Sequence, residues 1–273
     1  MRRSIDELRA FYGDPKGALV RRILAQRLDD AWGTADNCDI LGLGYATPWL
    51  GQFTGARRVI AAMPGGQGAE PWVATARNRT TLVDDRALPF PSGLFDRVLL
   101  VHAIEEADDP QALLNEVSRV LSPNGRVIVV SAARGGIWAR TESTPFGHGR
   151  PSSRKQMEGL IRRSGLEPRA WSQALYTPPW RAALPLAEGI EQFGRLILPG
   201  TAGLIMLEAG RRTYARSRPR GNAITALNPV PALNPVGARS LPHAKMSATD
   251  AATRRSHLVQ RAEPLYVGDP CTD

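Results

Sequence analysis

The stretch of the sequence that most constrains the fold is residues 88–106. It begins with a turn rich in proline and glycine, continues as an apolar run too short to cross a membrane, and ends in a polar cluster that contains His102, Glu105 and Glu106. This order is typical of a buried parallel strand with polar groups at its carboxyl end. Because doubly wound α/β sheets bind their ligands at the carboxyl ends of strands, we expect the polar cluster to lie near a ligand site.

Length and composition are consistent with one sizeable core. The chain has 273 residues, of which 42% are hydrophobic and 22% are charged. Its two cysteines give neither a disulfide framework nor a metal-ligand spacing, so we expect a reducing compartment and no metal. The N-terminus turns polar at once, and the apolar stretch 196–207 is broken by proline and glycine and falls short of the ~20 residues of a spanning helix. The sequence therefore predicts a cytoplasmic protein without a membrane span.

The formal net charge of +9 is concentrated in one segment. Five arginines lie between Arg211 and Arg220, which is more than half of the excess. A basic arm of this kind can bind nucleic acid or an acidic membrane, and a solvated end to the last structured element is the alternative.

Patterning divides the chain into three parts. Apolar residues at helical spacing on both sides of a Gly-Asp-Pro break predict a helical cap over residues 1–36. Residues 37–212 contain the short apolar runs and intervening helical patterns of an α/β domain. Residues 213–273 are basic and rich in proline and show no sustained periodicity, so we expect a disordered tail.

A strand-to-turn signal lies at residues 38–49. A short apolar strand runs into Gly42 and Gly44, and Thr47 is suited to be the N-cap of a following helix. Glycines here let the backbone pass close to a ligand, although a tight turn without a ligand has the same signature. A dinucleotide site would need a glycine at position 47 and an acid at the end of the second strand, where the chain has Met63. Nicotinamide cofactors are therefore disfavoured.

Two carboxylates, Asp84 and Asp85, follow a short apolar run that reads as the third strand. A carboxylate at the carboxyl end of a strand can accept a hydrogen bond from the exocyclic amine of an adenine. A loop acid solvated by water is the alternative.

The loop after the predicted fifth strand, residues 134–151, places guanidinium, imidazole and indole groups between glycines. Because it follows the carboxyl end of a strand, we expect it at the ligand edge of the sheet. Arg140 or Arg150 could hold an anionic group of a substrate there, and His148 could assist proton removal from a nucleophile. A loop pinned by its own arginine and histidine side chains is the alternative.

From Asp39 to about Val130, the chain resembles the class I S-adenosylmethionine-dependent methyltransferases, most closely the bacterial set with methyltransferase type 11 domains. The resemblance rests on several blocks in the family's order, which are residues 40–44, Asp84 ahead of 88–90, residues 95–98 with His102 and Glu105 following, and residues 113–127. It implies a doubly wound, Rossmann-like α/β sheet of seven strands, mostly parallel with an antiparallel last strand, and S-adenosylmethionine as cofactor.

The resemblance also implies roles for individual residues. The positions that correspond to the family's cofactor contacts are Gly42, Gly44, Tyr45, Met63, Asp84, Asp85 and His102. The two glycines would lie under the methionine part of the cofactor, Asp84 would contact the adenine, and His102 would border the methionine or the substrate. The family's ribose-binding acid falls on Met63, which is a departure from the pattern.

Three functions stay open on the sequence. The first is an S-adenosylmethionine-dependent methyltransferase that acts on a small molecule. Methyl transfer needs little more than positioning and a base, so no catalytic motif is required. The second is a noncatalytic ligand- or partner-binding protein on the same fold, which Ile40, Ala46 and Met63 favour. The third is an RNA methyltransferase that uses the basic arm, which lacks the aromatic interleaving of single-strand binders.

Overall fold

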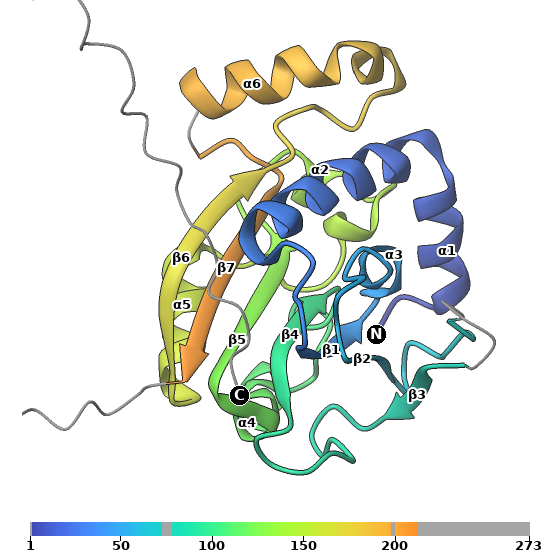
Figure 1. The fold of residues 1–273 in the computed structure, drawn as a ribbon. Coiled ribbons are helices and arrows are strands. Elements are labelled where there is room, and N and C mark those ends of the chain that lie inside the picture. The colour runs from blue at the N-terminus through green and yellow to red at the C-terminus, as the bar shows by residue number, and fades with distance from the viewer. Residues whose placement is uncertain (1, 73–77, 198–199, 212–273) are drawn as a thin grey trace, which may run out of the picture. The chain divides into compact units, whose positions relative to one another are not determined.

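The computed structural model describes residues 2–72, 78–197 and 200–211. These residues form one seven-stranded sheet with helices on both faces (Figure 1). Most of the predicted basic arm and the whole predicted tail, residues 213–273, lie outside the described residues. In chain order the strands are β1 (Asp39–Gly44), β2 (Arg58–Pro64), β3 (Thr80–Val83), β4 (Phe95–Val101), β5 (Leu121–Ala132), β6 (Leu166–Ala174) and β7 (Leu204–Arg211).

The helices divide into long amphipathic ones and short connecting turns. The α-helices are α1 (Ile5–Gly13), α2 (Pro15–Trp32), α3 (Thr47–Leu50), α4 (Pro110–Val120), α5 (Arg154–Arg163) and α6 (Ala187–Ile197). The 3₁₀ helices are η1 (Trp138–Arg140), η2 (Pro145–Gly147) and η3 (Arg181–Leu186). No helix in the described ranges is both long and apolar enough to span a membrane.

The strand order β3-β2-β1-β4-β5-β7-β6 confirms the predicted fold class. Strands β1 to β5 are parallel, and β7 lies antiparallel between β5 and β6. The order reverses between β1 and β4, where Gly42 lies opposite Leu99. Residues 88–106 thus supply a central strand at the topological switch point, which is where sheets of this type bind ligands.

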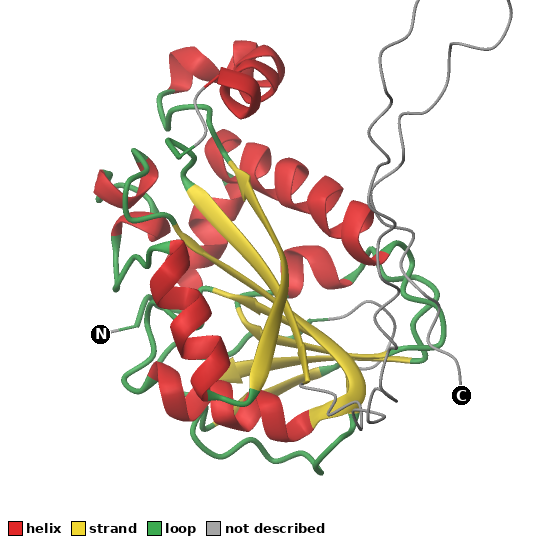
Figure 2. Ribbon diagram, turned by 90° about the vertical axis from the view of Figure 1, so that its left-hand side faces the viewer, coloured by secondary structure: helices red, strands yellow, loops and turns green. Residues whose placement is uncertain are grey.

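Both faces of the sheet are covered, because successive strand residues are apolar. On β4, Leu99 and Val101 belong to the core cluster that includes α1, α2 and α3, whereas Val98 and Leu100 belong to the cluster under α4 and α5. Figure 2 shows the sheet between these two groups of helices. With both faces buried, the ends of the strands are where the sheet can meet a ligand.

The helix boundaries follow local capping chemistry, with one exception. Ser4 caps α1 and Ser153 caps α5, each in a reciprocal capping box, and Asp14 separates α1 from α2 at the predicted break. The prediction that Thr47 caps a helix is wrong, because Ala46 is the N-cap of α3 and makes no side-chain hydrogen bond. The tight turn after Gly44 starts the helix one residue earlier than the capping pattern suggests.

Candidate functional site

The glycine turn brings β1 close to its neighbours at the carboxyl edge of the sheet. Gly44 has a φ of +83°, and a Cβ there would lie 2.2 Å from the carbonyl oxygen of Val101. A Cβ at Gly42 would lie 2.7 Å from the side chain of Leu50 on α3. The backbone N–H of Tyr45 donates to the same Val101 carbonyl at 2.8 Å. Both glycines are thus needed for packing, and their contact with a cofactor stays a prediction.

His102 follows β4 in a strained conformation. Its φ of 52° lies in the left-handed region that a non-glycine residue rarely adopts, and its side chain is fully buried. Its Nε2 lies 2.7 Å from the Tyr12 hydroxyl, its Nδ1 lies 3.4 Å from Oε1 of Glu105, and its ring is 4.7 Å from that of Phe146. Strain of this kind persists where the surroundings hold a side chain in a particular place, often at a binding site.

Around His102 lies a cluster of buried polar atoms that have no hydrogen-bond partner among the described residues. They are Nδ1 of His102, both carboxylate oxygens of Glu105 and Oε1 of Glu106. Both amide atoms of Gln67, which follows β2, are buried without a partner as well. Burial raises the pKa of Glu106, although its other oxygen accepts a hydrogen bond from the backbone of Arg3 at 2.9 Å. Each unsatisfied buried group costs about 1–3 kcal/mol, so a polar ligand at this edge would be stabilised by satisfying them.

The N-terminal segment, residues 2–12, covers this edge. Tyr12 stacks on Tyr45 with ring centroids 5.3 Å apart and also hydrogen-bonds His102. Arg2 forms an ion pair with Asp85. Three of the predicted cofactor residues are therefore in contact with this segment. The sequence indicated only a helical cap here, and the adjacent aromatics Phe11 and Tyr12 before the helix break were the available signal.

A carboxylate does lie at the end of β2, although not at position 63. Met63 is fully buried, and the backbone N–H of Glu70 lies 3.4 Å from its sulfur. The Glu70 carboxylate pairs with Nε of Arg9 at 2.6 Å and is hydrogen-bonded to the Tyr45 hydroxyl. Burial, followed by the charge of Glu70, raises the pKa of Tyr45. The sequence pattern did not identify Glu70, because it lies outside the strand.

The predicted adenine contact Asp84 lies at the end of β3 as expected, and its carboxylate is exposed. It accepts a hydrogen bond from the backbone N–H of Arg86 at 2.9 Å and pairs with the Arg86 guanidinium at 3.5 Å. The backbone hydrogen bond, more than the charge, lowers the pKa of Asp84. This geometry suits the solvated loop acid as well as it suits an adenine contact.

Residues 134–151 lie at the ligand edge, as predicted. The backbone N–H of Arg150 donates to the carbonyl of Glu105 at 2.8 Å, and Phe146 packs against His102. His148 Nε2 lies 2.7 Å from the carbonyl oxygen of Glu142, which assigns the proton to Nε2 and leaves Nδ1 as the acceptor in the neutral ring. Arg140 and Arg150 are exposed, and neither guanidinium forms an ion pair with a residue that the structure describes.

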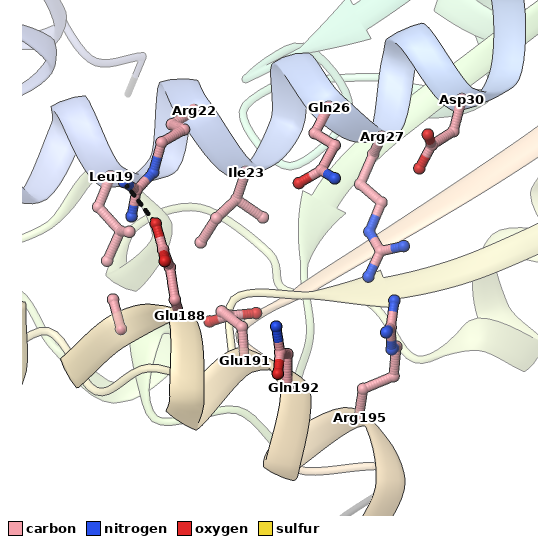
Figure 3. A pocket seen from close by; sticks show the side chains of 11 residues that line it. Leu19, Arg22, Ile23, Gln26, Arg27, Asp30, Glu188, Glu191, Gln192 and Arg195 are labelled. Carbon is pink, nitrogen blue, oxygen red and sulfur yellow. Dashed lines mark ion pairs between the residues drawn. The ribbon is translucent and has the colours of Figure 1, made fainter.

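Two cavities accompany these elements. One, of about 440 Å³, lies between α1 and the loop; its lining includes Arg3, Lys16, Arg181 and residues 142–145. The other, of about 290 Å³, lies between α2 and α6, where Arg27 and Arg195 point toward each other and Arg22 pairs with Glu188 (Figure 3). None of the predicted site residues lines either cavity. Within the described ranges, no cluster of metal-ligating side chains is found.

Comparisons with known proteins agree with this geometry. Residues 41–129 match the family model for a methyltransferase domain. A demethylmenaquinone methyltransferase from Thermus thermophilus is 33% identical over 100 residues, which are 33% of this chain and 46% of the relative. The chain spans about half the length of the curated relatives it matches.

Solved structures show the same fold at low identity. A chain of the complex between the Haloferax volcanii Trm112 methyltransferase activator and a methyltransferase is 16% identical, with a TM-score of 0.55, and the match covers 75% of this chain and 96% of that one. An S-adenosylmethionine-dependent methyltransferase from Thermotoga maritima is 17% identical, with a TM-score of 0.50, over 76% and 96% of the two chains. The predicted resemblance to class I S-adenosylmethionine-dependent methyltransferases is confirmed.

Proposed function

We propose that this chain, whose residues 41–129 match a methyltransferase domain and whose fold is that of the class I S-adenosylmethionine-dependent enzymes, transfers a methyl group to a small-molecule acceptor. The observation that carries the proposal is the cluster of buried, unsatisfied polar atoms at the carboxyl edge of β4. A cofactor with amine, carboxylate and hydroxyl groups can satisfy such atoms. The edge therefore fits S-adenosylmethionine.

The proposed cofactor contacts follow the carboxyl ends of β1 to β4. Gly42, Gly44 and Tyr45 would border the methionine part, and Asp84 and the backbone of Asp85 would border the adenine. Met63 would supply apolar surface, and His102 would face the methionine or the acceptor. When bound, the cofactor supplies an electrophilic methyl group, so the protein's task is to orient the acceptor and exclude water.

Cofactor binding requires the N-terminal segment to move. Tyr12 lies on Tyr45 and His102, and Arg2 holds Asp85, so these contacts occupy the positions that the cofactor would use. Leu8 of α1 is also buried in the core and Ile5 packs against it, so a shift of the segment uncovers apolar surface as well. The Asp14 break between α1 and α2 provides the hinge. We expect the segment to shift away from the edge when the cofactor enters.

The acceptor would approach beside the loop at residues 134–151. A cavity of about 440 Å³ lies between α1 and residues 142–145 of this loop, and Arg140, His148 and Arg150 lie outside its lining. In this proposal Arg140 and Arg150 bind an anionic part of the acceptor, and the free Nδ1 of His148 takes a proton from its nucleophile. The names of the relatives specify demethylmenaquinone, so its chemically reduced hydroquinone, whose ring carbon is nucleophilic where the quinone's is not, is the first acceptor to assay.

The test is a calorimetric titration of the full chain with S-adenosylhomocysteine, the product form of the cofactor. We expect a Kd of about 1–100 μM, and Asp84→Asn should weaken binding, whereas Asp30→Asn, an exposed carboxylate on α2, should not. Absence of heat at about 1 mM ligand would overturn the proposal. That result would favour the noncatalytic binding protein, whose edge is permanently covered by α1.

The division of the chain is part of the same proposal. The methyltransferase function is assigned to residues 37–212, with residues 1–36 as the cap over the site.

A further inference from the structure

The end of β2 is where a nucleotide ribose meets a doubly wound sheet. An acid near this position normally binds the ribose hydroxyls, because one carboxylate can accept hydrogen bonds from both. In this chain the strand ends in Met63 and Pro64, and a thioether is only a weak acceptor. The hydroxyls would lack a charged partner if the strand itself had to supply one.

The chain after β2 folds back toward the strand end. The backbone N–H of Gly65 donates to the carbonyl of Val83 on β3 at 3.0 Å, and the N–H of Gln67 donates to the carbonyl of Pro64 at 2.9 Å. This turn returns Glu70 to the strand, where its own N–H reaches the sulfur of Met63 at 3.4 Å. Glu70 thus contacts the side chain that stands where the acid is missing.

The Glu70 carboxylate is placed between the end of β2 and the glycine turn of β1. Only 16% of the side chain is exposed. The Tyr45 hydroxyl, directly after Gly44, is hydrogen-bonded to it, and Arg9 of α1 pairs with it at 2.6 Å. A carboxylate has about four acceptor sites, so two donors leave capacity for the hydroxyls of a sugar.

We infer that Glu70 binds the ribose hydroxyls of the cofactor and replaces the acid that position 63 lacks. The inference rests on the proposed function, since it assumes that the cofactor enters this edge. Arg9 belongs to the segment that must shift, so its ion pair with Glu70 is released as the hydroxyls take its place. Tyr45 stays in contact and keeps the carboxylate oriented.

The experiment compares two ligands on three proteins. The ligands are S-adenosylhomocysteine and its analogue without the two ribose hydroxyls. The proteins are the wild-type chain, Glu70→Gln and Glu158→Gln, all full length. Glu158 is a matched control, because it also forms a 2.6 Å ion pair, with Arg154, and 22% of its side chain is exposed. Binding is measured by calorimetry and folding by thermal denaturation.

We expect Glu70→Gln to weaken S-adenosylhomocysteine binding by about 10- to 150-fold, the equivalent of one charged hydrogen bond of 1.5–3 kcal/mol. Binding of the analogue should change less than about twofold, which also shows that the variant is folded. Glu158→Gln should bind both ligands as the wild type does.

The outcomes separate the two proposals. If the wild type binds S-adenosylhomocysteine and Glu70→Gln binds it equally well, the role of Glu70 is overturned and the proposed function stands. Equal losses for both ligands would also overturn it, because the effect would not involve the hydroxyls. If the wild type binds no S-adenosylhomocysteine, the proposed function fails and the role of Glu70 fails with it.

Discussion

Buried carboxylates at the two ends of the central strands differ in their hydrogen bonding. At the amino end of β1, Asp39 is only 4% exposed, and its carboxylate accepts hydrogen bonds from Nε and Nη2 of Arg57 at 3.2 and 2.9 Å. Its backbone N–H donates to Asp96 at 3.0 Å. At the carboxyl end, the buried carboxylate of Glu105 has no hydrogen-bond donor among the described residues. The two acids are similarly buried but differently satisfied.

A second set of polar contacts lies at the amino end of β4. Glu116 on α4 accepts a hydrogen bond from the backbone N–H of Leu88, and Arg119 donates to the carbonyls of Leu88 and Phe90. Glu116 and Arg119 also pair with each other at 2.7 Å. Polar groups at this end hold the loop that enters β4, whereas the buried carboxylate of Glu105 at the other end has no hydrogen-bond donor among the described residues. The difference is what the proposed function requires, with one end of the sheet stabilising the fold and the other available to a ligand.

The largest effect on stability should come from a substitution at the amino end of β1, where Asp39 is paired with Arg57. Asp39→Asn removes the charge that accepts two hydrogen bonds from Arg57, and should lower the free energy of unfolding by about 1.5–3 kcal/mol. Because Arg57 is half exposed and water can replace its partner, the lower part of that range is expected. Urea denaturation measures the change, with the exposed Asp6→Asn as control. A loss below about 0.5 kcal/mol would show that the clamp is not stabilising.

Much of the fold could be predicted from the sequence because its strands are continuous apolar runs with turn signals. Residues 88–106 predicted β4, and the polar residues after it predicted the position of His102 at the ligand edge. The Ser153 capping box is a local feature, because it is formed with Gln156 three residues later. Thr47 was not, since the turn at Gly44, fixed by contact with β4, decided where α3 begins.

The site was harder to predict because its contacts come from segments that return to the edge. Tyr12 reaches His102 across 90 positions of the chain, and Glu70 reaches Met63 through a turn that no strand or helix pattern marks. A periodicity argument assigns each residue to an element but not to a tertiary partner. Periodicity therefore located the carboxyl edge of the sheet and the glycine turn. It did not identify Tyr12 and Glu70, which contact them.

The carboxyl end of β4 can be tested by replacing Glu105, whose carboxylate has no hydrogen-bond donor among the described residues. Glu105→Gln should leave the free energy of unfolding unchanged or raise it by up to about 1 kcal/mol, because the replaced carboxylate is buried and accepts no hydrogen bond from the described residues. The matched variant is Glu208→Gln, because Glu208 is also buried but accepts from Trp32 Nε1 and pairs with Arg126. It should lose about 1–2 kcal/mol. A similar loss in Glu105→Gln would show that His102 pairs strongly with Glu105.

The smallest effect should appear in the pH dependence of stability. Burial raises the pKa of Glu106 above its ordinary value, so the folded state holds its proton to higher pH than the unfolded state does. Stability attributable to this group is therefore greatest below the ordinary carboxyl pKa, declines as pH rises through the raised pKa, and stays lower above it. In Glu106→Gln this decline should disappear between about pH 4 and pH 8, whereas the exposed Glu167→Gln should keep it. Urea denaturation across that range measures both variants. An unchanged decline in Glu106→Gln would mean that Glu106 is not the source of the pH dependence.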